Sequence, residues 1–100
     1  MQANVEKQPC VYLLASKRNG RLYVGVTSNL IRWTWEHRGH LDEVFTKEYQ
    51  VGTLVWFELH ETMQSPMRRE TQIKKWNRAW KIRMIESNNP AWRDLYSDLL

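Results

Sequence analysis

The sequence predicts a small α/β domain in which helices flank a three-stranded antiparallel sheet, in the order β-β-α-β-α-α. Three observations support this fold class. The chain has 100 residues, enough for one domain with a modest core. Asn19-Gly20 separates two short apolar runs, as in a β-hairpin. Helical patterns follow, interrupted by one further apolar strand. With no internal repeat or linker, we expect a flexible N-terminal tail over residues 1–9 and one domain over residues 10–100.

The predicted hairpin pairs residues 11–14 with residues 22–26 and carries one tyrosine on each strand. Symmetry about the turn brings Tyr12 and Tyr23 close together on one face of the sheet. Gly25 follows at the sheet edge, where it either leaves room above the backbone or marks a β-bulge.

A first helix is predicted over residues 30–38, because Thr27-Ser28-Asn29 can cap it and Gly39 can end it. At about 100° per residue, Arg32 points away from one shared helix face. That face carries Leu30, Trp33, Thr34 and His37.

The second half of the chain predicts one more strand and two more helices. Residues 40–52 show no clear period and are expected to form a loop with one or two helical turns. Residues 54–59 form the third strand, and their continuous apolar character favours a central place in the sheet. The longest helix is predicted from Ser65, as its cap, to about Glu86. Its core stripe comprises Ile73, Trp76, Trp80 and Met84. A last short helix starts at Asn89-Pro90 and packs back through Trp92, Leu95 and Leu99.

The composition is mildly basic, with 15 Lys and Arg against 11 Asp and Glu and a net charge of +4. This excess permits nucleic acid or an anionic surface as a partner without requiring either. Cys10 is the only cysteine, which excludes an internal disulfide and a cysteine-based zinc cage. The sequence has no signal peptide and no apolar run of membrane-spanning length, so we expect a cytoplasmic protein with no membrane partner.

The predicted long helix combines many cations with one carboxylate. Residues 68–83 contain seven basic side chains, and Glu70 is the only acid among them. One interpretation is a solvated helix face on which Glu70 and Lys74 form a supporting i, i+4 pair. The other is a phosphate-binding surface that holds one metal ligand, since Mg²⁺ often takes a single protein carboxylate together with water and substrate phosphate.

Tyr12, Tyr23 and His37 form the second group with chemical potential. Taken singly, each is more often a packing residue. Together, two hydroxyls and an imidazole can relay a proton from an attacking water molecule.

These motifs, in this order, resemble the GIY-YIG nuclease family, and in particular its small stand-alone bacterial members. The resemblance covers nearly all of the chain. Cysteine replaces the first glycine of the family pattern, which is a mild departure. The segments that carry the resemblance are Cys10-Val11-Tyr12, Tyr23-Val24-Gly25, Thr27-Ser28-Asn29-Leu30, His37 and Glu70.

The resemblance implies phosphodiester hydrolysis assisted by one divalent metal, Mg²⁺ or Mn²⁺, held by Glu70. Tyr12 would be the general base and Tyr23 the second hydroxyl, while His37 would orient groups or relay protons. An arginine on the first helix would steady the phosphate, and the product would carry a 5′ phosphate. The family's late asparagine has a candidate counterpart in Asn77. The nucleic-acid-binding residues would be Arg69, Lys74, Lys75, Arg78 and Lys81.

One departure from the family pattern is serious. Trp33 stands four residues before His37, where the catalytic arginine is expected. Indole carries no charge, and a preorganised charge-stabilising group contributes orders of magnitude to rate in comparable sites. Arg32 is the candidate substitute, although it lies about 100° around the helix.

Three functions follow from these observations. The first is a metal-dependent DNA endonuclease of reduced activity and little sequence specificity, in repair, recombination or clearance of nucleic acid. The second is a catalytically silent module that binds nucleic acid through Lys74, Lys75, Arg78 and stacking tryptophans. The third is a protein-interaction module. DNA is expected over RNA, and the chain is expected to be a monomer or weak homodimer.

Overall fold

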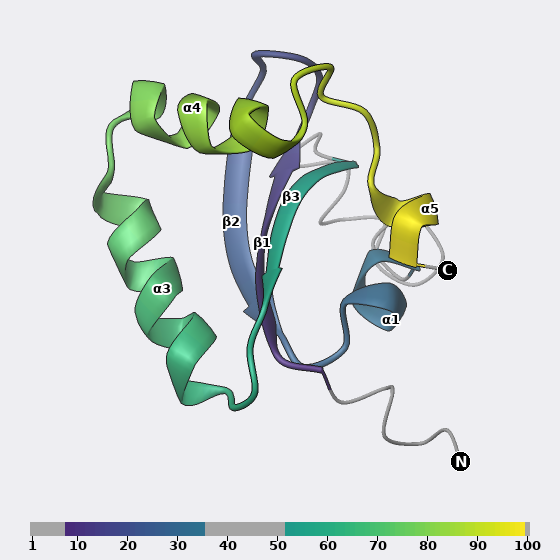
Figure 1. Ribbon diagram of the computed structural model, residues 1–100, viewed down its shortest axis with the longest axis vertical. Helices are drawn as coiled ribbons and strands as arrows, with labels where there is room; N and C mark the ends of the chain where they lie inside the picture. The colour runs from purple at the N-terminus through teal and green to yellow at the C-terminus, as the bar shows by residue number, and fades with distance from the viewer. Residues whose placement is uncertain (1–7, 36–51, 100) are drawn as a thin grey trace.

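The computed structural model describes residues 8–35 and 52–99, and it confirms the predicted fold class. The sheet contains β1 (Cys10–Ala15), β2 (Leu22–Thr27) and β3 (Thr53–Leu59), all antiparallel to their neighbours. The helices are α1 (Leu30–Trp35), α3 (Gln64–Lys75), α4 (Arg78–Asn88) and α5 (Tyr96–Leu99). Figure 1 shows α3 and α4 together on one side, and α1 beside α5 on the other. None of the described helices is long and apolar enough to cross a membrane.

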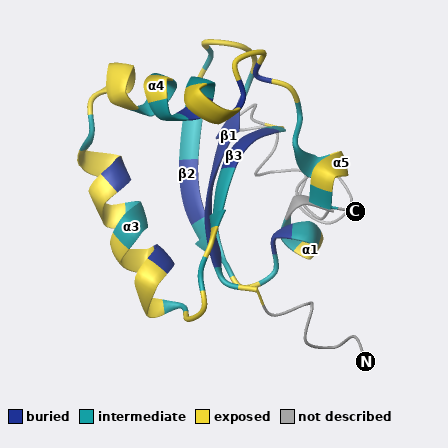
Figure 2. Ribbon diagram, in the orientation of Figure 1, coloured by how far each residue is buried: buried dark blue, intermediate teal, exposed yellow. Residues whose placement is uncertain are grey.

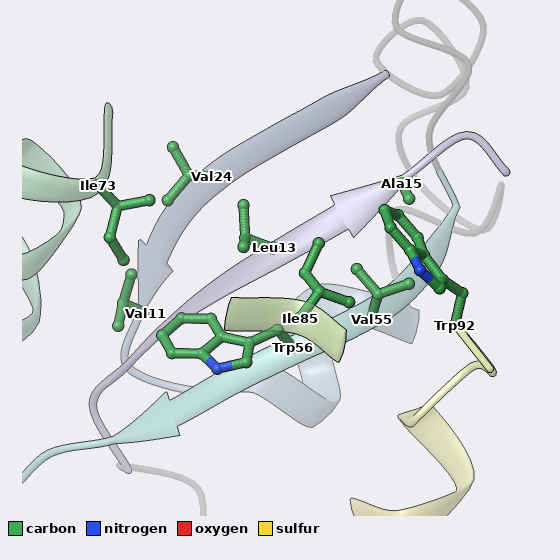
Figure 3. Packing of buried hydrophobic residues seen from close by; sticks show 9 residues of the cluster. All are labelled: Val11, Leu13, Ala15, Val24, Val55, Trp56, Ile73, Ile85 and Trp92. Carbon is green, nitrogen blue, oxygen red and sulfur yellow. The ribbon is translucent and has the colours of Figure 1, made fainter. Parts of the chain in front are cut away.

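The central strand β1 is buried along its whole length (Figure 2), and its residues alternate between two cores. Because successive strand side chains point to opposite faces, Val11, Leu13 and Ala15 contribute to one cluster. Figure 3 shows this cluster over the three strands, with Ile73 at one end and Trp92 at the other. Cys10, Tyr12 and Leu14 belong to the opposite cluster, together with Leu54 of β3. Leu30 and other parts of α1 and α5 cover this cluster.

β3 is an edge strand, so the prediction of a central third strand was wrong. The strand order is β2-β1-β3. A register shift pairs Leu13 with Trp56 but Leu14 with Leu54, which leaves Val55 as an extra residue. The bulge lets Val55 and Trp56 both join the cluster under α4. The continuous apolar run therefore reflects a bulged strand covered on both faces rather than a central position.

The predicted single helix from Ser65 to Glu86 is also wrong, because the chain forms two helices there. Trp76 is extended (φ −72°, ψ 151°), and Asn77 starts α4 by accepting a hydrogen bond from the Trp80 backbone N–H at 2.9 Å. Asparagine is among the best N-cap residues, and its capping bond competes with helix continuation. The break interrupts the predicted stripe, so Trp80 is half exposed instead of core.

The last helix begins at Tyr96 and not at Asn89-Pro90 as predicted. Asn89 is buried and anchors the segment before it, with Nδ2 donating to the carbonyl oxygens of Val55 (3.1 Å) and Arg93 (2.9 Å). Trp92 packs in the cluster under α4, whereas Leu95 packs on the opposite face of the sheet. The chain thus crosses around the β3 edge between these two residues. The predicted packing of Trp92, Leu95 and Leu99 is confirmed, but on two faces.

The predicted end of the first helix near Gly39, residues 40–51 of the predicted loop and His37 lie outside the described residues. The start of that helix is confirmed. The Asn29 side chain accepts a hydrogen bond from the Arg32 backbone N–H at 3.0 Å, and the Thr27 hydroxyl accepts one from Asn29 N–H at 3.1 Å.

Candidate functional site

The two tyrosines of the hairpin lie together, as predicted. In the β1–β2 register Tyr12 faces Gly25 and Leu14 faces Tyr23, which makes the tyrosines diagonal neighbours on one face. Their ring centroids are 6.3 Å apart. The two strands pair without a register shift, so Gly25 does not mark a bulge.

Gly25 makes room for the Tyr12 ring, which lies across the neighbouring strand. A Cβ built at Gly25 would lie 2.5 Å from the Tyr12 hydroxyl oxygen and 2.8 Å from Cζ. Real Cβ atoms do not approach other atoms this closely. The glycine therefore fixes where the Tyr12 hydroxyl can sit.

Trp33 covers the other side of this tyrosine. Its indole packs against Tyr12 with ring centroids 4.4 Å apart and planes inclined by 44°. As a result Tyr12 is only 1% exposed. Trp33, at the position of the expected arginine, thus shields Tyr12 from solvent with an apolar side chain.

The electrostatic setting keeps Tyr12 protonated. Burial raises the pKa of its hydroxyl well above the ordinary range, and electrostatic interactions with Tyr23, Cys10 and Glu70 act in the same direction. A hydrogen bond with Tyr23 raises that pKa further, as expected where it stabilises the neutral form. Near neutral pH the hydroxyl is therefore a proton donor.

Glu70 lies on α3, which packs against β2 and β1. Its carboxylate is 3.2 Å from the Lys74 ammonium, so the predicted i, i+4 pair is confirmed. The side chain of Glu70 is 21% exposed and that of Lys74 is 56% exposed. The charge of Glu70 raises the pKa of Tyr12, which indicates that α3 brings this carboxylate near the tyrosines.

Glu70 suits one kind of metal site. In the part of the chain that the structure describes, no three His, Cys, Asp or Glu side chains gather into a metal-binding group. The partly exposed Glu70 carboxylate is nevertheless a hard oxygen donor, of the kind that holds Mg²⁺ or Mn²⁺ with water and phosphate completing the shell. The residues present fit such an ion.

Several predicted phosphate-binding residues already have partners within the chain. Arg69 Nε lies 3.2 Å from Glu58 Oε1, and its guanidinium stands 5.3 Å from the Trp76 ring. Arg78 donates to the carbonyl oxygens of Asn19 (2.5 Å) and Gly20 (2.7 Å), so it ties α4 to the hairpin turn. Lys75 is exposed, and Lys81 is half-buried.

The structure also shows where three other predicted residues lie. Asn77, the candidate asparagine near the metal, caps α4. Arg32 is exposed on α1. The predicted cap of α3 is wrong, because the helix begins at Gln64 without a side-chain cap. Ser65 instead contacts His60.

Sequence reasoning missed two polar anchors. His60 bridges Ser65, through Nδ1 at 2.5 Å, and Glu58, through Nε2 at 2.8 Å, which fixes the end of β3 to the start of α3. Asn89 is buried against the β3 bulge. The only sequence signal for Asn89 was its place before a proline at a helix end, which predicts a stop but no buried side chain.

Comparisons with known proteins agree with this geometry. Residues 8–83 match the GIY-YIG catalytic domain. A UPF0213 protein of Staphylococcus haemolyticus is 34% identical over 76 residues, which cover 76% of this chain and 92% of that protein. A UPF0213 protein of Syntrophus aciditrophicus is 34% identical over 79 residues, covering 78% of this chain and 90% of that protein. No solved structure matches the chain. With the tyrosine pair on its hairpin and Glu70 on the helix beside it, this chain belongs to the GIY-YIG family.

Proposed function

We propose that this protein is a metal-dependent endonuclease that hydrolyses phosphodiester bonds in DNA, with activity reduced by Trp33. The observation that carries the proposal is the Tyr12–Tyr23 pair, seated over Gly25 and influenced by the Glu70 carboxylate, within a GIY-YIG domain. Residues 10–100 would form the nuclease domain. We expect a cytoplasmic monomer or weak homodimer that prefers DNA to RNA.

Glu70 would hold the metal, Mg²⁺ or Mn²⁺. That ion would neutralise charge on the scissile phosphate and lower the pKa of the attacking water. Lys74, 3.2 Å from the same carboxylate, adds positive charge where the phosphate would bind. Lys75 and Lys81 would contact flanking phosphates, which position the strand without reading its sequence.

The attacking water would release its proton to solvent, because the metal would lower its pKa. The half-buried Tyr23 hydroxyl would accept a hydrogen bond from that water, and Tyr12 would hold Tyr23 in place through their hydrogen bond. The general-base role that the family resemblance implies for Tyr12 does not suit a buried hydroxyl that stays protonated near neutral pH. The new bond forms between the water oxygen and phosphorus as the O3′–phosphorus bond breaks. The departing O3′ then takes a proton, for which His37 is the proposed relay.

Trp33 would lower the rate in two ways. It supplies no positive charge for the transition state, and its indole packs on Tyr12, where it restricts access to the tyrosine pair. Arg32 is the proposed substitute cation. The same observation favours the second candidate function, a catalytically silent module that binds nucleic acid through the basic helices and tryptophans.

The test compares Glu70→Gln with a matched control, Glu61→Gln, which changes an exposed acid before α3. Labelled single-stranded, duplex and branched DNA and RNA are incubated with each protein in Mg²⁺, Mn²⁺ or EDTA. We expect metal-dependent cutting of DNA by the unchanged protein and by Glu61→Gln, and none by Glu70→Gln. Cutting that survives in Glu70→Gln or in EDTA would contradict the proposal. Binding by all three proteins without any cutting would favour the silent module.

A further inference from the structure

A shallow groove lies at the junction of α3 and α4, where the predicted long helix is interrupted. Its lining residues are Trp76, Trp80, Arg83, Met84 and Ser87. We call it the tryptophan groove. The Trp80 side chain is 51% exposed, one of the largest exposed apolar surfaces in the described chain. Trp76 meets it edge-on, with centroids 5.9 Å apart and planes inclined by 76°.

The helix break creates this arrangement. In a continuous helix, residues four apart would lie side by side along one face. The extended backbone at Trp76 and the new helix start at Asn77 turn the rings instead into an L-shaped corner. A corner of this kind can take a flat ring against one indole face and contact its edge with the other.

The surroundings of the groove are positively charged. Arg83 forms part of its lining. Arg69, which pairs with Glu58 at 3.2 Å, stands over the Trp76 ring with Nη2 3.8 Å from the Met84 sulfur. The segment 64–88 contains seven basic residues and two acids, Glu70 and Glu86. Glu70 is paired with Lys74, and Glu86 accepts a hydrogen bond from the Trp92 indole at 2.6 Å. No acid is among the lining residues.

Charge and shape together select the occupant. An exposed aromatic corner within a cationic surface complements a ligand that is both flat and anionic, and an unpaired nucleotide of a DNA strand has these properties. In duplex DNA the base faces are stacked on one another, so they could not enter the corner. An apolar protein partner would gain nothing from the surrounding arginines.

We propose that the tryptophan groove stacks an unpaired base of DNA, while Arg83 contacts a neighbouring phosphate. This inference rests on the proposed function and names its substrate class. Trp76 directly follows α3, the helix that also carries Glu70. An unpaired base is available only where the strands are separated, which predicts that branched or single-stranded DNA binds better than blunt duplex.

The test measures binding by fluorescence anisotropy in EDTA, so that it does not depend on cleavage. The ligands are a single-stranded DNA oligonucleotide, an abasic strand of equal length and charge, a blunt duplex and the matching RNA strand. The variants are Trp80→Ala, Trp80→Phe and the control Met67→Ala, which removes a 52% exposed side chain on α3 outside the groove. Thermal unfolding verifies that each variant is folded.

We expect the unchanged protein to bind the DNA strand roughly tenfold more tightly than the abasic strand, since stacking of one base has about this effect. Trp80→Ala should erase that difference and leave abasic and duplex binding unchanged. Trp80→Phe should keep part of it, and Met67→Ala all of it.

Four results would overturn the inference. They are equal affinity for normal and abasic strands, an equal loss for every ligand in Trp80→Ala, dependence on Trp80 for RNA alone, and a homodimer that Trp80→Ala dissociates without any change in DNA binding. The proposed function fails separately. Binding of single strands that depends on Trp80, without cutting in any metal, would retain the groove and exclude the nuclease, whereas cutting that depends on Glu70 but not on Trp80 would do the reverse.

Discussion

The two faces of β1 differ in chemistry, although they come from alternate residues of one strand. Val11, Leu13 and Ala15 face an apolar cluster that is closed by α3 and α4 and includes the indoles of Trp56 and Trp92. Cys10, Tyr12 and Leu14 face a cluster that contains a thiol and the phenols of Tyr12 and Tyr23. The period-2 alternation of a strand thus separates the groups that hold the fold from the groups that would do chemistry.

Because of this separation, stability and activity should respond to different substitutions. The helix-covered face has only apolar groups to lose, so changes there should act on the free energy of unfolding. The tyrosine face has hydroxyl groups in a fixed arrangement, so changes there should also alter the site. Substitutions on the two faces test this division.

Ile85→Ala should give the largest loss of stability. Ile85 is fully buried between α4 and the sheet, and removing its side chain should lower the free energy of unfolding by about 3 kcal/mol. Urea unfolding measures this, with Ile82→Ala, at a half-buried position on the same helix, as the smaller control. DNA affinity of the folded fraction should not change. A loss below about 1 kcal/mol, or a change in that affinity, would contradict the division between the two faces.

Gly25→Ala should give the second largest loss of stability, because the added methyl group forces the Tyr12 ring to move. We expect a loss of about 2 kcal/mol from overpacking, with a changed near-ultraviolet circular dichroism signal from the aromatic cluster. Tyr12→Leu removes the atoms that the new methyl group would meet. The double variant should therefore lose less than the sum of the single variants. Strict additivity would show that Gly25 and Tyr12 do not compete for the same space.

Cys10 should be chemically inert in the folded protein. Burial raises the pKa of its thiol to about 12 from an ordinary value of 9.0, and the thiolate is the reactive form. A raised folded-state pKa stabilises the protein fully below pH 9 and loses that contribution between about pH 9 and 12. We expect no alkylation by iodoacetamide at pH 8 until urea unfolds the chain. Rapid labelling of the folded protein would show that this face is open to solvent.

Lys74→Ala should have the smallest effect on stability. The pair with Glu70 is a partly exposed i, i+4 salt bridge, and its loss should lower the free energy of unfolding by less than about 0.5 kcal/mol. Urea unfolding at low and high salt measures it, and the difference should vanish at high salt. A loss above about 1 kcal/mol would mean that the pair is more deeply buried than its exposure indicates.

The sequence predicts the local parts of this protein well. Tyr12 and Tyr23 were placed together by a turn signal and strand alternation, and the α1 cap by Asn29, because each depends on a few neighbouring residues. Glu70 and Lys74 met because helix geometry determines their spacing. These features need no knowledge of the rest of the fold.

What depends on distant contacts was not predicted. The bulge at Val55 is stabilised by Asn89, 34 residues later, and nothing in either segment alone indicates it. The helix breaks before Asn77 because a capping hydrogen bond competes with helix continuation. Apolar periodicity does not reveal which of the two prevails. The indole of Trp33 was recognised as a departure from the family pattern, but its packing on Tyr12 required the structure.

The most direct test of the central proposal, that Trp33 lowers the activity of the candidate nuclease site, is the single-turnover cleavage rate of Trp33→Arg in Mn²⁺. Trp33→Leu, which removes the indole without adding charge, and Trp33→Arg/Glu70→Gln are measured beside it. We predict that Trp33→Arg cuts DNA roughly 100-fold faster than the unchanged protein, that Trp33→Leu gains little, and that the double variant does not cut. Equal rates for Trp33→Arg and the unchanged protein would contradict the account.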